Sequence, residues 1–205
     1  MHQNCGFLFC CGRLLVIGFN HNFLNLLSQE YSFPVGLSAN WVNPTQLKPQ
    51  QSLLNDWLLN TGSLTERLQA NSSQFAVQVI GQKKLVPDSS EARLLPDLHK
   101  YEWQIREVVL YGDNQPWVYA RSVLPDFLCS TKWAGLGTQP LGQRIFNDDQ
   151  FVRSGFEIAK LACNPINPIQ KQTLWARRSV FTMEAYHLLV AEVFLPNCPA
   201  YRSGA

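Results

Sequence analysis

Charged side chains inside otherwise apolar strands are the residues in this chain best suited to chemistry. Glu192 lies within the apolar run 188–195, and Arg106 and Arg121 lie in two other strand-like runs. Burying a charge is costly unless the charge is paired or has a function. The planar guanidinium fork of arginine suits a carboxylate ligand. The pattern therefore indicates either structural ion pairs or the polar ends of a binding site, and the residues alone leave both interpretations open.

The strand before Glu192 contains two candidate partners, Arg177 and Arg178. If the turn at 183–187 closes a simple hairpin, Arg178 falls opposite Glu192 and on the same face. A slip of one residue in register brings Arg177 or Ser179 opposite instead. In either case the sheet can supply an arginine fork and a carboxylate in a mostly apolar interior.

Two expected helix starts add a second kind of anion site. Ser63 and Glu66 form a capping box that places Leu64 at the first helical position. Thr138 can cap another helix, with Leu141 in its first turn. Backbone N–H groups in a first turn lack helical partners and bind anions. Each start is weak evidence alone, but with a buried arginine they predict a pocket for a small carboxylic acid.

The elements that position these residues follow from periodicity and turn residues. Two hairpins are expected, one around Gly112, Asp113 and Asn114 and one around 183–187, and 87–96 is expected to be a loop. Strands are predicted at 75–84, 101–111, 117–124, 175–182 and 188–195, and helices at 49–59, from Ser63 onward and within 133–146. Sequential hairpins with interposed helices indicate an α+β domain with an antiparallel sheet.

Composition excludes several classes of protein. The chain has 205 residues, 46% of them hydrophobic and 16% charged, with a net charge of +2. A disordered chain would be less hydrophobic and more highly charged, and a large nucleic-acid surface would be more basic. No nucleotide-binding or metalloprotease motif occurs, and no cysteine pair has C-x-x-C spacing, so neither a metal nor a cofactor is expected.

Three of the six cysteines fall in the first eleven residues. The other three, Cys129, Cys163 and Cys198, lie far apart and are interpreted as isolated thiols in a reducing compartment, which predicts a cytoplasmic protein. The N-terminal run 6–19 is strongly apolar, but it is interrupted by Arg13 and is too short to span a bilayer. It also lacks the basic start and cleavage site of a signal peptide. Residues 1–40 are therefore predicted to be either a weakly ordered extension of unknown role or the product of a mis-assigned start, with a non-methionine start for instance at Val35.

From about Trp41 onward, the chain resembles the chorismate pyruvate-lyase family of ubiquinone biosynthesis. The stretches that carry the resemblance stand in the family's order: LLNDWLL with SLTER at 53–67, REVVL at 106–110, QPWVYARSVLP at 115–125, GTQPLGQRIF at 137–146, LWARRS at 174–179 and AEVFLP at 191–196. The resemblance implies a catalytic domain over 41–205, built as a single antiparallel sheet with helical flaps over an enclosed pocket.

The implied activity converts chorismate to 4-hydroxybenzoate and pyruvate, the first committed step toward ubiquinone. The resemblance further implies that chorismate is the small-molecule partner, that no metal or organic cofactor takes part, and that the protein is a cytoplasmic monomer. The near-neutral net charge predicts no nucleic-acid partner, and the short apolar run predicts no stable membrane insertion.

The resemblance also assigns roles residue by residue. Arg106 matches the arginine that holds the ring carboxylate, and Leu64 and Leu141 match positions that contact the ligand through the backbone. Glu192 matches the carboxylate at the opposite end of the ligand, where it would bind the ring hydroxyl and act as a general base. Separately from the resemblance, Arg121 or Arg178 is expected to lie behind these residues and to offset the charge of the enolpyruvyl carboxylate.

The chain departs from the family in three places. Leu64 stands where the family often has methionine, 163–173 looks like an insertion, and 1–40 match nothing in the family. The alternative function is a non-catalytic sensor domain of the same fold that binds a small carboxylate, as in some transcription regulators. Such regulators carry a DNA-binding module before the sensor, and residues 1–40 show no capped helix-turn-helix.

Overall fold

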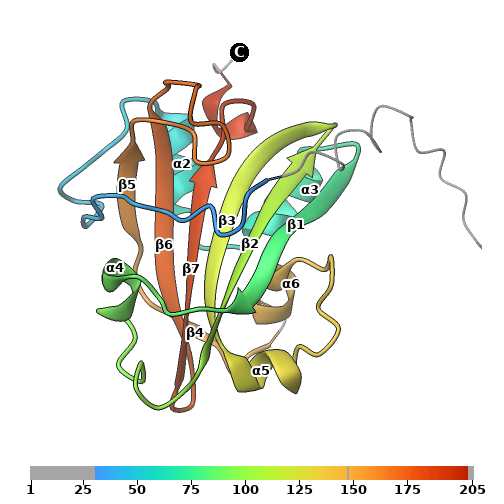
Figure 1. Cartoon of the computed structure of the whole chain (residues 1–205). Helices are drawn as coiled ribbons and strands as arrows, with labels where there is room; N and C mark the ends of the chain where they lie inside the picture. Colours follow the sequence, from blue (N-terminus) through green and yellow to red (C-terminus); the bar gives the residue numbers. More distant parts are fainter. Residues whose placement is uncertain (1–30, 147, 203–205) are drawn as a thin grey trace, which may run out of the picture.

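The computed structural model describes residues 31–146 and 148–202. Within this part of the chain, seven strands form one antiparallel sheet in the order β1-β2-β3-β7-β6-β4, with β5 also pairing with β6 (Figure 1). The strands are β1 (Phe75–Lys84), β2 (Trp103–Gly112), β3 (Gln115–Pro125), β4 (Val152–Arg153), β5 (Glu157–Leu161), β6 (Leu174–Met183) and β7 (Tyr186–Phe194). The prediction of an α+β domain with a single antiparallel sheet is confirmed.

Short helices cover the sheet from both sides. They are α2 (Ser52–Leu59), α3 (Leu64–Ala70), α4 (Ser89–Ala92), α5 (Asp126–Ser130), α6 (Leu141–Phe146) and a 3-10 turn, η1 (Pro199–Tyr201). Figure 1 shows α2, α3, α5 and α6 on one side of the sheet, with α4 and the chain that follows residue 31 on the other. The helices expected near 49–59, after Ser63 and within 133–146 are therefore the covering layer of one face.

Strand alternation divides the sheet into two faces, which we call the flap face and the strap face. The flap face carries Val108 and Ala120 and packs against Trp57 of α2 and Leu64 of α3. The strap face carries Val109, Tyr119 and Ala191 and is crossed by residues 31–42, whose Leu37 and Trp41 are buried on it. Because successive side chains in a strand point to opposite faces, adjacent charged residues are separated by the thickness of the sheet.

The two main hairpins turn more tightly than expected. Asp113 and Asn114 make the β2–β3 turn with φ of 49° and 63°, the positive values that a two-residue hairpin turn needs. Glu184, with φ of 53°, begins the equally short β6–β7 turn. This turn pairs Arg177 with Glu192. The expected pairing of Arg178 with Glu192 is wrong by one residue, because the turn is shorter than the segment 183–187 assigned to it.

Several short elements escaped prediction. The expected loop 87–96 contains α4, which Asp88 and Glu91 cap reciprocally, and the D-S-S-E sequence is a readable signal for it. Strands β4 and β5 have two and five residues, too few for a clear period. Helix α6 begins at Leu141, so Thr138 stands before the helix and does not cap it.

The strap face is closed by a segment that the sequence left without a role. The backbone N–H groups of Val35 and Gly36 donate to the two carboxylate oxygens of Glu107, at 2.7 and 2.9 Å. Leu37 and Trp41 are each 8% exposed. The expected domain boundary at Trp41 therefore lies within a packed stretch, while residues 1–30 lie outside the described residues.

The described cysteines, Cys129, Cys163 and Cys198, are free thiols, as expected. Burial raises the pKa of Cys129 to about 11, so its thiol stays protonated near neutral pH. Cys5, Cys10 and Cys11 lie outside the described residues. None of the described helices is long and apolar enough to cross a membrane.

The two flap helices meet directly above the sheet. A Cβ atom built on Gly142 of α6 would stand 2.9 Å from the hydroxyl oxygen of Thr65 in α3. One turn away, the side-chain amide of Gln143 donates to that of Gln69 at 3.2 Å. Glycine at position 142 thus permits the flaps to approach each other this closely.

We expect Gly142→Ala to push the flaps apart and to lower the free energy of unfolding by about 1–2 kcal/mol, because the added methyl group overpacks the contact. Thr65→Ala in the same chain should recover most of this loss, since it removes the clashing oxygen. Thr65→Val, which keeps an atom at that position, is the matched control and should recover none. Urea denaturation measures all three, and an additive Gly142→Ala/Thr65→Ala double variant contradicts the contact.

Candidate functional site

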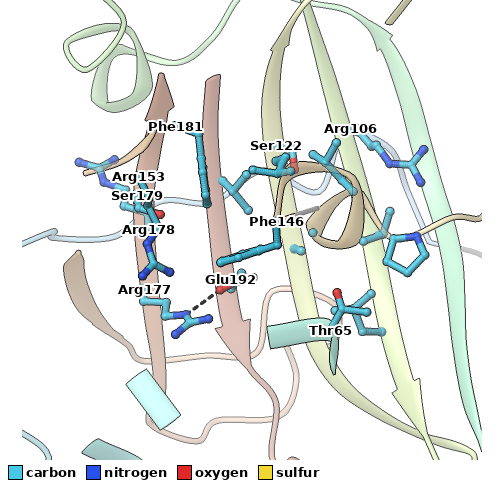
Figure 2. A pocket seen from close by; sticks show the side chains of 18 of the residues that line it. Thr65, Arg106, Ser122, Phe146, Arg153, Arg177, Arg178, Ser179, Phe181 and Glu192 are labelled. Atoms are coloured by element: carbon cyan, nitrogen blue, oxygen red, sulfur yellow. Dashed lines mark hydrogen bonds and ion pairs between the residues drawn. The ribbon is translucent and has the colours of Figure 1, made fainter. Parts of the chain in front are cut away.

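A pocket lies between the flap face of the sheet and the flap helices, and it collects residues from distant parts of the sequence (Figure 2). Its polar ends come from the strands, with Arg106 on β2 and Glu192 on β7. Figure 2 shows Arg106 on one side of this space and Glu192 with Arg177 on the other. The predicted meeting of Arg106 and Glu192 at one pocket therefore agrees with the geometry.

Arg106 is a buried cation whose described hydrogen-bond partners are all neutral. Its side chain is 3% exposed and donates to the Gln82 side chain at 2.9 Å and to the carbonyl oxygens of Gly137 at 2.8 Å and Gln139 at 3.4 Å. Burial lowers the Arg106 pKa from its ordinary value. Among the described residues, no carboxylate lies within ion-pair distance of it, so an anionic ligand would supply the missing countercharge.

Glu192 is held in place by Arg177. The Arg177 Nε donates to Glu192 Oε2 at 2.6 Å. The Arg177 Nη1 donates to the carbonyl oxygens at the end of α2, those of Trp57 at 3.1 Å, Leu58 at 3.3 Å and Asn60 at 2.9 Å. Arg177 thereby satisfies helix-terminal carbonyls and orients the carboxylate at once.

The second carboxylate oxygen of Glu192, Oε1, is available to a ligand. Its side chain is 19% exposed, and Oε1 has no hydrogen-bond partner among the described residues. The carboxylate therefore borders the pocket with an acceptor available to a ligand hydroxyl.

Leu64 and Leu141 are each the first residue of a flap helix. This position was predicted for Leu64, whereas Leu141 was predicted only to lie somewhere in the first turn. Leu141 lines the pocket, and in α3 the lining residue is Thr65, the neighbour of Leu64. The N–H groups of a first helical turn have no partner within the helix. Both helix starts are thus at the pocket, and the start of α6 follows the 137–139 loop whose carbonyl oxygens the Arg106 guanidinium contacts.

Aromatic rings form much of the remaining wall, and a further arginine lies against them. Phe146, Phe156 and Phe181 line the pocket. The Arg153 guanidinium carbon lies 4.4 Å from the centre of the Phe156 ring and 5.6 Å from that of Phe146. The guanidinium carbon of Arg177 also lies against Phe156, 4.7 Å from the centre of its ring. The middle of the pocket is thus suited to a flat, largely apolar ring.

The two arginines expected behind the site, Arg121 and Arg178, turn their guanidinium groups to the strap face. Arg178 borders the pocket on β6, but its Nε donates to Glu157 at 2.7 Å and its guanidinium carbon lies 4.6 Å from the Trp41 ring centre. Burial lowers the Arg178 pKa, and Glu157 partly opposes this. Neither guanidinium group faces the side of the sheet that carries Glu192.

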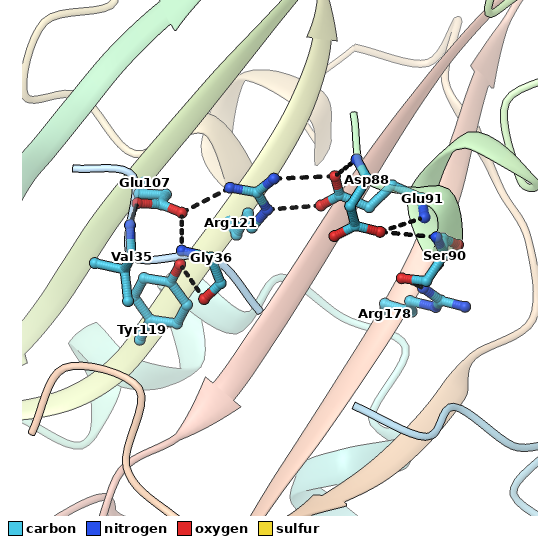
Figure 3. Close-up of polar contacts among 9 residues, drawn as sticks. All are labelled: Val35, Gly36, Asp88, Ser90, Glu91, Glu107, Tyr119, Arg121 and Arg178. Atoms are coloured by element: carbon cyan, nitrogen blue, oxygen red, sulfur yellow. Dashed lines mark hydrogen bonds and ion pairs between the residues drawn. The ribbon is translucent and has the colours of Figure 1, made fainter. Parts of the chain in front are cut away.

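Arg121 joins two buried glutamates across the strap face (Figure 3). Its Nε donates to Glu91 at 2.6 Å and its Nη1 to Glu107 at 2.7 Å, and all three side chains are at most 6% exposed. Burial acts to lower the Arg121 pKa, but the hydrogen bonds and attraction of Glu91, followed by those of Glu107, raise it overall. The chain Glu107–Arg121–Glu91 ties the strap segment to α4 through the middle of the sheet.

Sequence reasoning missed Arg153 and the surrounding rings. Arg153 stands in the two-residue strand β4, which has no periodicity to reveal a face. Only the pairing of Arg153 with Phe181 on β6 turns it toward the pocket. A signal was nonetheless present, because Arg153 stands between two aromatic residues, Phe151 and Phe156.

The arrangement has a clear chemical polarity. A cation with neutral partners stands at one end, a carboxylate with a free oxygen stands at the other, and apolar and aromatic side chains separate them. Such a pocket suits a ring that carries a carboxylate on one side and a hydroxyl on the other.

Comparison with known proteins places this pocket in a family. The family model described as chorismate lyase matches residues 37–203. The chain belongs to the chorismate lyase family. The resemblance drawn from the sequence stretches is therefore confirmed, and the match begins four residues before Trp41, in the segment that packs on the strap face.

Individual relatives agree with the family match. The chain is 42% identical over 184 residues to a Pseudoalteromonas atlantica protein named "Probable chorismate pyruvate-lyase", with 84% of this chain and 94% of that protein covered. A Shewanella amazonensis protein of the same name is 37% identical over 185 residues, covering 84% of this chain and 96% of its own.

Among solved structures, PhnF from Mycobacterium smegmatis shares the fold, with a TM-score of 0.50 at 16% identity over 68% of this chain and 66% of that one.

Arg121→Met should destabilise the fold without touching the pocket. Removing the cation leaves Glu91 and Glu107 buried and unpaired, and loss of one partner of a buried ion pair costs about 3–5 kcal/mol of unfolding free energy. Urea denaturation checks this against Lys84→Met, which removes exposed ion pairs with Glu102 and Asp126 and should have a much smaller effect. Equal effects of the two substitutions contradict a central structural role for Arg121.

Proposed function

We propose that this protein converts chorismate to 4-hydroxybenzoate and pyruvate, as a cytoplasmic enzyme at the first committed step toward ubiquinone. The observation that carries the proposal is the pocket's polarity in a member of the chorismate lyase family. Among the described residues, Arg106 is buried without a carboxylate partner, and Glu192 stands across the same space with one oxygen that has no hydrogen-bond partner. Chorismate has a ring carboxylate and a ring hydroxyl that match these two ends.

At the first end, Arg106 holds the ring carboxylate. The guanidinium is already oriented by Gln82 and by the carbonyl of Gly137, so little side-chain entropy remains to be lost when the anion binds. The N–H groups that open α3 and α6 add neutral donors at the same end. The ligand's charge then compensates a cation that the fold has already buried.

At the second end, Glu192 accepts a hydrogen bond from the ring hydroxyl. In the reaction the ether C–O bond to the ring breaks, the hydroxyl-bearing ring carbon loses its proton, and the released enolpyruvate gains a proton to become pyruvate. Glu192 stands beside the carbon that loses the proton and can act as a general base there. Arg177 keeps the carboxylate aimed at that carbon.

Catalysis of this reaction requires mainly that the protein orients the substrate and places charged groups around it. Loss of pyruvate makes the ring aromatic, so the overall reaction is strongly downhill. A pocket that fixes both ends of the ring and excludes water contributes through alignment and preorganised electrostatics. The walls of Phe146, Phe156 and Phe181 supply the flat slot for this alignment.

The test mixes the purified full chain with chorismate and quantifies 4-hydroxybenzoate and pyruvate. Equimolar formation of both products, well above the spontaneous rate, is the expected result. Tight binding of chorismate without turnover would instead favour the alternative of a sensor domain, and the absence of both would sink the proposal.

Arg106→Met and Glu192→Gln should separate binding from turnover. Loss of the buried cation should weaken binding of 4-hydroxybenzoate by about 30-fold or more, which corresponds to about 2 kcal/mol. Loss of the carboxylate base should lower kcat by about 100-fold or more, with a smaller change in KM. Calorimetry and steady-state kinetics measure these effects.

The matched controls are Arg93→Met and Glu102→Gln, which change exposed charges outside the pocket lining and should leave both quantities near wild type. Circular dichroism and urea denaturation show whether each variant is folded. A folded Glu192→Gln protein with wild-type kcat contradicts the role of Glu192 as the base.

A further inference from the structure

The pocket carries more positive charge than the proposed roles of Arg106 and Glu192 use. Three guanidinium groups and a single carboxylate belong to it, because Arg153 and Arg177 stand on the Glu192 side in addition to Arg106. The guanidinium of Arg178 is turned to the strap face and is paired there with Glu157. The described lining therefore has two positive charges in excess.

The excess is distributed over both ends of the pocket. At the Glu192 end, Arg177 is paired with the carboxylate through Nε and donates to three carbonyl oxygens through Nη1. Arg153 is different, because its partners among the described residues are the Thr61 carbonyl at 2.8 Å and the faces of two phenyl rings. No described carboxylate lies within ion-pair distance of Arg153, which makes it the uncompensated cation at this end.

The electrostatics of Arg153 place it close to the reacting end. Burial is the main cause that lowers its pKa, the positive charge of Arg177 lowers it further, and the negative charge of Glu192 raises it. Arg153 and Arg177 also contact the same ring, that of Phe156. A guanidinium with one hydrogen-bond partner among the described residues thus shares the Phe156 ring with Arg177, the residue that holds Glu192.

We propose that Arg153 binds the second carboxylate of the substrate, the one carried by the enolpyruvyl group, and thereby distinguishes substrate from product. The inference rests on the proposed function. In chorismate the enolpyruvyl ether is attached to the ring carbon next to the hydroxyl-bearing one, so its carboxylate lies at the Glu192 end. The two uncompensated cations, Arg106 and Arg153, then match the two carboxylates of the ligand.

The aromatic product has only the ring carboxylate, so it can use Arg106 but not Arg153. When the ether bond breaks, the second carboxylate leaves as part of pyruvate, and Arg153 loses its anionic partner. Arg153 therefore contributes to affinity for the substrate and nothing to affinity for 4-hydroxybenzoate. This role replaces the one that the sequence assigned to Arg121 or Arg178, whose guanidinium groups face the other side of the sheet.

Arg153→Met tests the inference through two ligands that differ in one carboxylate. We expect KM for chorismate to rise about 10- to 100-fold, the worth of a lost charge-assisted hydrogen-bond pair. The dissociation constant of 4-hydroxybenzoate, measured by calorimetry, should stay unchanged within error. Arg153→Lys should show an intermediate rise in KM, because it keeps the charge but not the planar fork.

Arg106→Met serves as the positive control, since it should weaken both ligands, and Arg93→Met as the negative control, since it should weaken neither. If Arg153 acts only by tying β4 to the Thr61 carbonyl, its loss should weaken product and substrate alike, which overturns the inference. An unchanged KM in a folded Arg153→Met protein overturns it too. Failure of the proposed function itself is a separate result, because it appears as missing turnover in the wild-type chain.

Discussion

The two-residue alternation of a β-strand is the constraint on which the rest of this structure depends. It sends Arg106 to one face and Glu107 to the other, and it does the same to Arg177 and Arg178. On the strap face the charges neutralise one another, with Arg121 between two glutamates. On the flap face they do not, and cations remain there with neutral partners. The sheet thus carries a network of paired charges on the strap face and, among the described residues, arginines without anionic partners on the flap face.

Much of the fold could be predicted because the long strands are strongly patterned. The run 75–84 was predicted with the bounds that β1 has, and β2, β3, β6 and β7 differ from prediction by one or two residues at each end. The shorter elements could not be found in this way, since two or five residues contain too little of a period. The role of the strap segment could not be predicted either. Residues 35–36 act through backbone N–H groups that donate to Glu107, which is 71–72 residues away in sequence.

The candidate site divides along a similar line. Arg106 and Glu192 were recognisable as charges in apolar strands, and Leu64 and Leu141 as residues at helix starts. The roles predicted for Arg121 and Arg178 required their guanidinium groups to face the pocket, but both groups pair with glutamates on the strap face. Which face a strand residue takes depends on register and on tertiary partners, and a single sequence specifies neither. Arg153 was missed for the opposite reason, since its position is set almost entirely by its neighbour on β6.

The short β6–β7 turn has a consequence for how this chain can change over time. Its two-residue length pairs Arg177 with Glu192, although Glu184 and Ala185 lie at the far end of the hairpin. Adding or deleting a single residue there would slide one strand past the other and exchange the arginine that faces the pocket. Loops usually accept insertions freely because they carry no packing. In this turn the number of residues sets the register of β6 and β7. Substitutions that keep the two-residue length should therefore be tolerated, whereas insertions and deletions should not.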